Sequence, residues 1–188
     1  MKTGHRLETD RLIIRPFNLN QNDRNFFYRV DSDEEMMRFF PWRSSTQEAE
    51  AKLVRIVEMG KKSGLTWAMA SLKNTGEPIG FTGLWQVTFD APFTPAVEIG
   101  WRYVPEHWGK GYATEGAREL LRHAFEDLNL PSIVSFAVEQ NRASINVMGK
   151  IGMTEDPMSP FMHNAVPDTH QHLKRHVLYR INNPNKQR

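Results

Sequence analysis

The chain of 188 residues contains no cysteine. This absence excludes a disulfide framework, a zinc site built on thiolates and a cysteine nucleophile, and it suits a reducing compartment. The sequence also lacks an apolar run long enough to cross a membrane, and its first eight residues lack the apolar core of a signal peptide. We therefore expect a cytoplasmic protein that has no membrane partner.

An excess of charge of one sign is also absent. Lys and Arg number 24 against 22 Asp and Glu, which gives a formal net charge of +2. A nucleic-acid-binding domain usually carries a strongly basic surface, so nucleic acid is not expected as a partner. Hydrophobic residues make up 39% and charged residues 24%, as in soluble globular proteins. We expect a single domain over residues 1–188, monomeric or homodimeric, in which residues 182–188 fray.

What the sequence does contain is an alternation of strand-like and helix-like segments. Ser45 and Glu48 have the spacing of a capping box at a helix start. Apolar residues recur at helical spacing from Tyr112 to Leu128, and Asn141 precedes a shorter helix. Strands are predicted at 11–15, 65–72, 78–89, 96–104, 132–138 and 176–181, and helices at 22–30, 46–60, 112–128 and 141–151, with a helical turn at 33–40. This order predicts an α/β fold with a mixed sheet.

A glycine-rich segment, Trp108-Gly109-Lys110-Gly111, joins a predicted strand to a predicted helix. Unpaired N–H groups and the helix dipole make such a turn a binding site for phosphate. A kinase P-loop needs Ser or Thr after its lysine, and here Lys110 is followed by Gly111. A dinucleotide fingerprint needs a third glycine where Thr114 stands. The segment therefore indicates a different phosphorylated cofactor.

The segment from Glu98 to Leu128 resembles the coenzyme A-binding core of the GNAT (GCN5-related) N-acetyltransferase superfamily. Gly109 and Gly111 match the two small positions in the loop of that core. Glu106 stands where Gln or Arg is usual, which removes one expected side-chain contact. The backbone cradle is unaffected, because amide groups do most of the binding there.

Other parts of the chain carry the same resemblance. The block 141–153 is similar to the second coenzyme motif of the superfamily, with an Asn-x-x-Ser opening at Asn141 and Ser144. The segments 7–16 and 175–180 are similar to the Rim-type branch, which includes ribosomal-protein N-terminal acetyltransferases. These matches follow the order of the superfamily and span nearly the whole chain.

The resemblance implies the GNAT fold, an α+β domain with a mixed, mostly antiparallel sheet flanked by helices and with splayed central strands. It implies direct transfer of an acetyl group from acetyl-CoA to a primary amine, of a protein N-terminus or a small molecule, through a ternary complex. A catalytically silent acyl-CoA-binding module is the alternative. The coenzyme-binding residues implied are Trp101, Tyr103, Val104, Trp108, Gly109, Lys110, Gly111, Tyr112, Ala113, Thr114, Asn141, Ser144 and Lys150.

Two residues are candidates for catalysis. Glu98 lies in an apolar strand, where a carboxylate is costly unless it faces a cleft or has a partner, and burial would raise its pKa toward that of a useful base. A structural ion pair with an arginine is the other interpretation. The resemblance implies that Ser144 hydrogen-bonds the leaving sulfur, whereas a helix-capping role is its alternative. The oxyanion donor is expected among the N–H groups from Trp101 to Val104, beside a bulge at Gly100.

Two other chemistries find no support. No tyrosine lies between Tyr112 and Tyr179, so the tyrosine acid of many superfamily members has no obvious equivalent. No metal is expected, because there is no cysteine and no zinc spacing among four C-terminal histidines, which are His163, His170, His172 and His176. The acceptor is expected to depend on the loops 36–42, 90–95 and 161–172.

Overall fold

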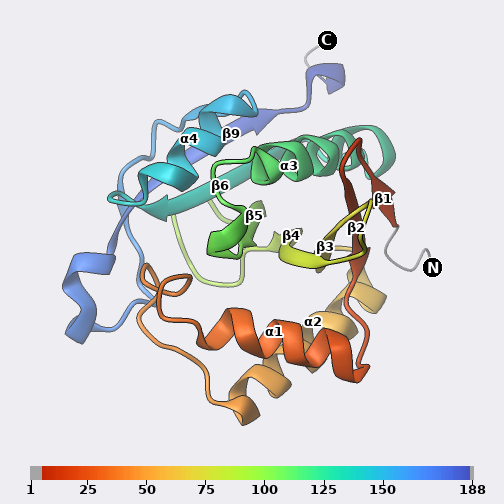
Figure 1. The fold of residues 1–188 in the computed structure, drawn as a ribbon. Coiled ribbons are helices and arrows are strands. Elements are labelled where there is room, and N and C mark those ends of the chain that lie inside the picture. The colour runs from red at the N-terminus through yellow and green to blue at the C-terminus, as the bar shows by residue number, and fades with distance from the viewer. Residues whose placement is uncertain (1–5, 187–188) are drawn as a thin grey trace.

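One sheet of nine strands crosses the protein, and helices cover both of its faces (Figure 1). The computed structural model describes residues 6–186. The strand order is β1-β2-β3-β4-β5-β6-β9-β7, with β8 also paired to β9, and within residues 6–186 only β5 and β6 are parallel. The mixed, mostly antiparallel sheet is therefore confirmed. The strands are β1 Leu7–Glu8, β2 Leu12–Pro16, β3 Trp67–Leu72, β4 Pro78–Gln86, β5 Val97–Tyr103, β6 Ser132–Val138, β7 Thr154–Glu155, β8 Phe161–Met162 and β9 Arg175–Asn182.

The four α-helices of the described residues form the two outer layers, α1 and α2 on one side of the sheet and α3 and α4 on the other (Figure 1). The capping box is present, because the Ser45 hydroxyl accepts from the N–H of Glu48 and the Glu48 carboxylate accepts from the N–H of Ser45. No described helix has both the length and the apolar character needed to cross a membrane. The helices are α1 Gln21–Ser32, α2 Thr46–Ser63, α3 Tyr112–Arg122 and α4 Arg142–Lys150.

Some local predictions are wrong. The helix predicted over 112–128 ends at Arg122 and continues as a π-helical segment, His123–Asp127. The helical turn predicted at 33–40 is present as hydrogen-bonded turns, in which the N–H of Met37 donates to the carbonyl of Asp33 at 3.1 Å. Within the tail predicted to fray, the Asn183 side chain is buried and donates to the carbonyl of Leu130 at 2.9 Å. Residues 187–188 lie outside the described residues.

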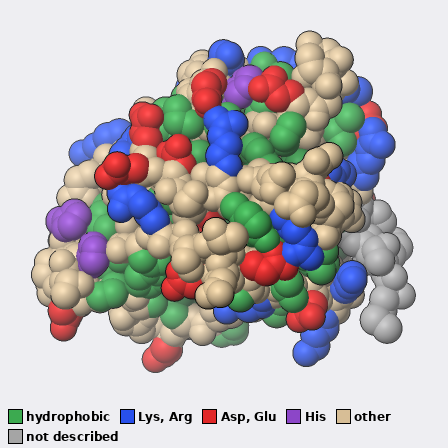
Figure 2. Space-filling view, turned by 60° about the horizontal axis from the view of Figure 1, so that its bottom comes forward, with side chains coloured by type: hydrophobic (Ala, Val, Ile, Leu, Met, Phe, Trp, Pro, Cys, Tyr) green, Lys and Arg blue, Asp and Glu red, His purple; other side chains and the backbone are tan. Residues whose placement is uncertain are grey.

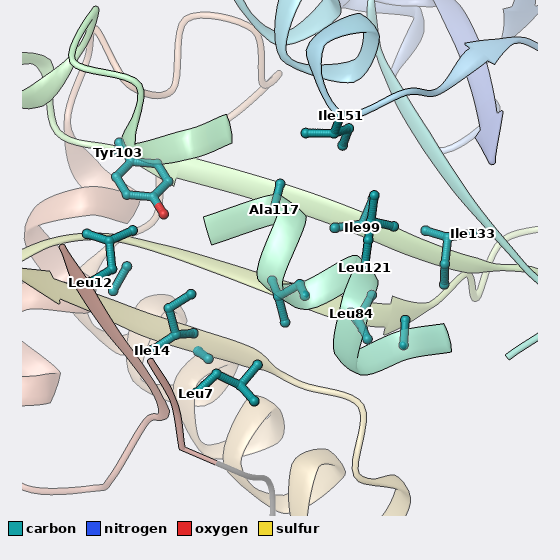
Figure 3. Close-up of a cluster of buried hydrophobic side chains, with 14 of the residues drawn as sticks. Leu7, Leu12, Ile14, Leu84, Ile99, Tyr103, Ala117, Leu121, Ile133 and Ile151 are labelled. Atoms are coloured by element: carbon teal, nitrogen blue, oxygen red, sulfur yellow. The ribbon is translucent and has the colours of Figure 1, made fainter. Parts of the chain in front are cut away.

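The core has one layer on each face of the sheet. On the α3 side, Ile99 of β5 and Ile133 of β6 are fully buried and point toward Ala117 and Leu121 of α3 (Figure 3). On the opposite side, aromatic and aliphatic side chains from α1, α2, β3 and β4 pack together. This second layer includes Phe26, Phe27, Leu53, Met69 and Phe81.

The two parallel strands meet at a single position. Glu98 of β5 pairs with Val134 of β6, and both strands run on toward their carboxyl ends without further pairing. The splayed central strands are thus present, but the bulge predicted at Gly100 is wrong, because β4 and β5 keep one register throughout. Gly100 is needed for another reason, since a Cβ there would lie 2.4 Å from the indole ring of Trp67. The register shift lies elsewhere, between Ala70 and Ser71 of β3.

Candidate active site

Strand β5 presents alternate side chains to the two layers, as the period of a strand requires. Ile99 and Tyr103 are buried in the core on the α3 side. Glu98 and Arg102 have the opposite parity, and Arg102 reaches α1, where its Nη1 lies 3.1 Å from a carboxylate oxygen of Asp31. The two ionisable side chains of β5 therefore face the α1 and α2 side, next to the point where β5 and β6 separate.

The backbone of β5 has an unpaired edge toward β6. The N–H of Val87 donates to the carbonyl of Ala96 at 3.0 Å, and the Thr82 hydroxyl donates to the carbonyl of Gly100 at 2.8 Å. Because ladder bonds alternate along an antiparallel pair, even-numbered residues of β5 direct their polar groups toward β4. The amide groups of Trp101 and the N–H of Tyr103 thus line the gap beyond the last pair with β6. Such an edge can pair with an extended chain carrying amides.

The sequence after β5 forms an anion cradle. Gly109 and Gly111 have φ of 72° and 82°, in the left-handed region that favours glycine. Within residues 6–186, no acceptor receives a hydrogen bond from the N–H groups of 109–114, and the first bond of α3 runs from Glu115 to the carbonyl of Gly111 at 3.0 Å. The exposed Lys110 adds a positive charge. The N-terminus of α3 can therefore bind phosphate through backbone donors.

The N-terminal hairpin fixes the shape of this cradle. Arg11 donates through Nε to the Glu115 carboxylate at 2.6 Å and through Nη1 to the carbonyl of Lys110 at 3.0 Å. The Thr9 hydroxyl donates to the same carboxylate at 2.6 Å. Burial raises the pKa of Glu115, but the bonds from Thr9 and Arg11 lower it further, so it stays below its usual value. Thr9 and Arg11 lie in a segment that carried the family resemblance, yet their role was missed because it depends on a partner about a hundred positions away.

Two side chains of the loop are used within the protein. Glu106, at the position where the family usually has Gln or Arg, pairs with Arg29 at the end of α1 at 2.7 Å. The indole N–H of Trp108 donates to the carbonyl of Tyr103, and the Arg38 guanidinium lies 4.9 Å from the ring of Trp108. These contacts tie the loop to α1 and to the segment that follows it.

Glu98 is half-buried, and no described residue hydrogen-bonds to its carboxylate. Burial raises the pKa of Glu98 to about 8, and the charge of Arg102 lowers it only in part. No ion pair joins the two side chains, because Arg102 pairs with Asp31 instead. A carboxyl group with a pKa near the working pH can accept a proton, as general base catalysis requires.

A polar network behind Arg102 was not predicted. Asp31 is buried and accepts from Lys52 at 2.8 Å as well as from Arg102. Burial raises the pKa of Asp31, but the bonds from Lys52 and Ser44 and the charge of Arg102 lower it further, so the carboxylate stays ionised. These residues come from α1, α2, β5 and the segment before α2, and no local pattern relates them.

Helix α4 starts beside the gap, at the carboxyl end of β6. Asn141 caps it, since the side-chain oxygen accepts from the N–H of Ser144 at 3.2 Å. The Ser144 hydroxyl does not act as the cap, and no described residue hydrogen-bonds to it. Lys150 lies at the other end of α4, where its carbonyl accepts from Arg118 of α3 at 2.8 Å. Asn141 and Ser144 therefore lie at the start of α4, close in sequence to the carboxyl end of β6, and Lys150 lies at the opposite end of the helix.

The side chains of Tyr103 and Val104 are buried, at 5% and 2% exposure, so only their backbone groups can reach a ligand. The N–H of Val104 is already used, because it donates to the carbonyl of Ile79 at 3.0 Å. Tyr112, Ala113 and Thr114 form the first turn of α3 and are half-buried. Among the predicted coenzyme-binding residues Trp101, Tyr103 and Val104, only Trp101 and Tyr103 therefore have backbone groups that face the gap.

Two of the C-terminal histidines, His163 and His176, pack in an aromatic cluster at β8 and β9. The rings of His163 and His176 are 4.9 Å apart, and Phe89 lies 4.1 Å from His163. Burial, together with the charge of His176, lowers the pKa of His163 to about 4. Across residues 6–186, no group of three His, Cys, Asp or Glu side chains could hold a metal ion. These two histidines are neutral aromatic packing groups.

The sequence matches the family described as an acetyltransferase (GNAT) domain over residues 11–154. It is similar to the FsC-acetyl coenzyme A-N(2)-transacetylase of Aspergillus fumigatus, with 33% identity over 82% of this chain and 67% of that protein. Its fold is similar to a GNAT-family acetyltransferase from Bacillus anthracis, with a TM-score of 0.77, 23% identity and coverage of 95% and 99% of the two chains.

A further solved structure has the same fold and was determined with the coenzyme. The spermidine N-acetyltransferase of Vibrio cholerae, in complex with CoA and spermine, gives a TM-score of 0.72 at 17% identity and covers 93% of this chain and 97% of its own. Together with the family match over three quarters of the sequence, this agrees with the anion cradle and the splayed strands. The chain therefore belongs to the GNAT acetyltransferase family and is an acetyl-CoA-dependent acyltransferase.

Proposed function

We propose that the protein transfers the acetyl group of acetyl-CoA directly to a primary amine while both substrates are bound. The observation that carries this proposal is the position of Glu98 at the single β5–β6 pair, where the unpaired edge of β5 begins. A thioester laid along that edge, with its phosphates on the loop 109–114, would end beside this carboxyl group.

The coenzyme would be held mainly by backbone groups. The N–H groups of 109–114 and the charge of Lys110 would bind the pyrophosphate. The amides of the pantetheine arm would pair with the edge at Trp101, as an added strand does. Asn141, which caps α4, would contact the same arm. The thioester would then lie between β5 and the start of α4.

The chemistry follows from these positions. Glu98, directly or through water, takes a proton from the ammonium form of the acceptor, and the free amine attacks the thioester carbonyl. The N–H of Trp101 or Tyr103 stabilises the oxyanion that develops. As the new C–N bond forms, the C–S bond breaks, the nitrogen loses its second proton and the thiolate takes one up. Ser144 donates a hydrogen bond to that sulfur, since no tyrosine occupies this region.

The acceptor would be a protein N-terminus or a small primary amine. The name of the Aspergillus relative describes transfer of an acetyl group to a nitrogen atom, which supports an amine acceptor. The acceptor would approach from the α1 and α2 side, where the loop 36–42 packs on Arg102 through Phe40 at 4.0 Å.

Thermal denaturation and thiol release test the proposal. Acetyl-CoA should raise the melting temperature, whereas ATP and NAD should not. Thiol release should appear with at least one member of a panel of peptides, polyamines, amino sugars and amino acids. Binding of acetyl-CoA without turnover on any acceptor would favour a silent acyl-CoA-binding module, and no binding at all would overturn the coenzyme assignment.

A further inference from the structure

The guanidinium of Arg102 has one edge in use and one edge unused. Nη1 donates to Asp31 at 3.1 Å and lies 3.4 Å from the sulfur of Met37. Nε and Nη2 donate to no described residue. Neither atom is among the buried polar atoms that lack a partner, and the side chain is 21% exposed, so both donors face solvent.

The unused edge is the one that suits a carboxylate. The N–H groups on Nε and Nη2 of an arginine point the same way and can donate two parallel bonds to one planar anion. Arg122 in this chain uses that edge, donating to Glu119 from Nε at 3.0 Å and from Nη2 at 2.8 Å. Arg102 presents the same donors without an internal acceptor.

The edge is held in place before any ligand binds. The Arg102 guanidinium lies 4.0 Å from the ring of Phe40 and 5.4 Å from that of Phe81. Asp31 anchors it from behind and is itself held by Lys52 at 2.8 Å. A guanidinium restrained on two rings and one carboxylate loses little freedom when it binds an anion.

Charge at this position also favours an anion. Asp31 carries one negative charge but pairs with two cations, Lys52 and Arg102. The Glu98 carboxyl group is mostly uncharged at neutral pH, because burial raises its pKa to about 8. The single carboxylate of Asp31 therefore faces two cations, and Arg102 shares it with Lys52. Elsewhere on the face nearer α1 and α2, acidic and basic side chains are interspersed (Figure 2).

The position of Arg102 relative to Glu98 assigns the edge to the acceptor. Both side chains lie on one face of β5, and Gly100 between them has no side chain. The Trp67 ring covers Gly100 and forms an apolar floor. The coenzyme, in contrast, would use the backbone edge of β5 and the loop before α3. An acceptor lying on the Trp67 ring could place its amine at Glu98 and another group at Arg102.

We propose that the Nε and Nη2 edge of Arg102 binds a carboxylate of the acceptor, so that the substrate is a primary amine that also carries a carboxylate. This inference rests on the proposed function, because it names the acceptor of the same site. It makes Arg102 a specificity-determining residue.

Paired acceptors test the assignment. Amino acids with amines at increasing distances from the carboxylate are compared with their carboxamides, which keep the amine and lose the charge. The native protein should acetylate at least one such acid with a kcat/KM about 10- to 100-fold above that of its amide, the range expected for charged hydrogen bonds. Equal use of acids and amides would overturn the inference while leaving the acetyltransferase proposal intact.

Variants separate recognition from folding. Arg102→Gln should bring kcat/KM for the acid down to that of the amide and leave acetyl-CoA affinity unchanged. Turnover of both acceptors should also fall, because the charge of Arg102 no longer lowers the pKa of Glu98. Arg102→Lys keeps the charge beside Asp31 but loses the two parallel donors. Its kcat/KM for the acid should therefore lie between the values for the native protein and for Arg102→Gln. Arg55→Gln is the matched control, because Arg55 is exposed on α2 and lies 5.8 Å from the ring of Trp85. Equal losses for acid and amide in Arg102→Lys would contradict the inference.

Discussion

The two sides of the candidate site differ in the groups they offer, which are backbone groups on one side and side chains on the other. On the coenzyme side, the useful groups are backbone N–H groups of 109–114 and the cap at Asn141, all close in sequence to the helices they start. On the acceptor side, they are side chains brought together over long separations, as Arg102 and Asp31 are across 71 positions. The backbone groups proposed to bind the coenzyme are thus encoded locally, whereas the charges proposed to select the acceptor depend on the assembled fold.

The largest expected effect lies on the acceptor side. Glu98→Gln keeps the shape of the side chain and removes the base, so kcat should fall by about 10²- to 10³-fold. Because the pKa of Glu98 is about 8, activity of the native protein should rise with pH up to that value. The variant should lose this rise, which pH–rate profiles measure. Glu58→Gln is the control, because Glu58 is exposed on α2, and its profile should match that of the native protein.

Glu98→Gln should lower activity but raise stability at high pH. The folded pKa of Glu98 lies above its usual value of 4.5, so the native protein loses stability as pH rises from about 4.5 to about 8. Glu98→Gln avoids that loss and should be more stable at pH 9, by about 1–3 kcal/mol after allowance for partial exposure. Denaturant unfolding at pH 5 and pH 9 measures the difference, and a gap that does not grow with pH would contradict burial of the carboxyl group.

The next largest effect lies on the coenzyme side. Gly111→Glu places a side chain at φ of 82° and a negative charge among the phosphate donors, so acetyl-CoA affinity should fall about 10- to 100-fold. The new Cβ would lie 3.5 Å from Nη2 of Arg11, so the carboxylate would also compete with Glu115. Calorimetric titration measures the affinity.

The control for that variant is Gly76→Glu. Gly76 has φ of 75° and open space around it, in the turn between β3 and β4. Gly76→Glu should lose as much stability as Gly111→Glu, because the backbone strain is the same. Its affinity for acetyl-CoA should stay at the native value. Equal affinity losses in the two variants would mean that Gly111 acts through stability alone.

A smaller effect tests whether the shape of the loop 109–114 depends on the distant N-terminal hairpin. Arg11→Ala removes the contacts to Glu115 and to the carbonyl of Lys110, and it should weaken acetyl-CoA about 3- to 10-fold with a stability loss of about 1 kcal/mol. Arg6→Ala, which breaks an exposed pair with Glu8, should change neither quantity. Unchanged affinity in Arg11→Ala would show that the loop keeps its shape without the N-terminal hairpin.

The smallest effect is expected at Ser144. Ser144→Ala removes one neutral donor near the leaving sulfur, so kcat should fall about 2- to 10-fold with acetyl-CoA affinity unchanged. Ser63→Ala, at the end of α2, is the control and should keep native turnover. If Ser144→Ala instead lowered stability and left kcat unchanged, the residue would be structural and the sulfur would need another donor.

The sequence predicted the parts of the fold that local chemistry dictates. Ser132–Val138 has the predicted bounds, and the caps at Ser45 and Asn141 are present, because each depends on residues within one helical turn. The left-handed glycines of the loop were identifiable for the same reason. The two-residue strands β1, β7 and β8 were missed, since a short edge strand carries no periodicity of its own.

The site was only half predictable. Glu98 was identifiable because a carboxylate in an apolar strand is unusual, whereas Arg102 gave no such indication beside Trp101 and Tyr103. Its role depends on Asp31, Lys52 and Phe40, which reach it from three other segments. The bulge at Gly100 was a wrong inference from glycine in a strand, because the missing Cβ makes room for Trp67.

In strand β5, odd and even positions have different roles. Side chains at odd positions face the core on the α3 side and those at even positions face the proposed acceptor, while the backbone groups of odd positions face the gap. Inserting or deleting one residue within Val97–Tyr103 would turn Glu98 toward α3 and Ile99 toward the acceptor, and would also exchange the N–H groups at the gap. Diversification of this segment is therefore confined to substitution at fixed length. New acceptors would be reached by exchanging side chains such as Arg102, and by lengthening the loops around the strand rather than the strand itself.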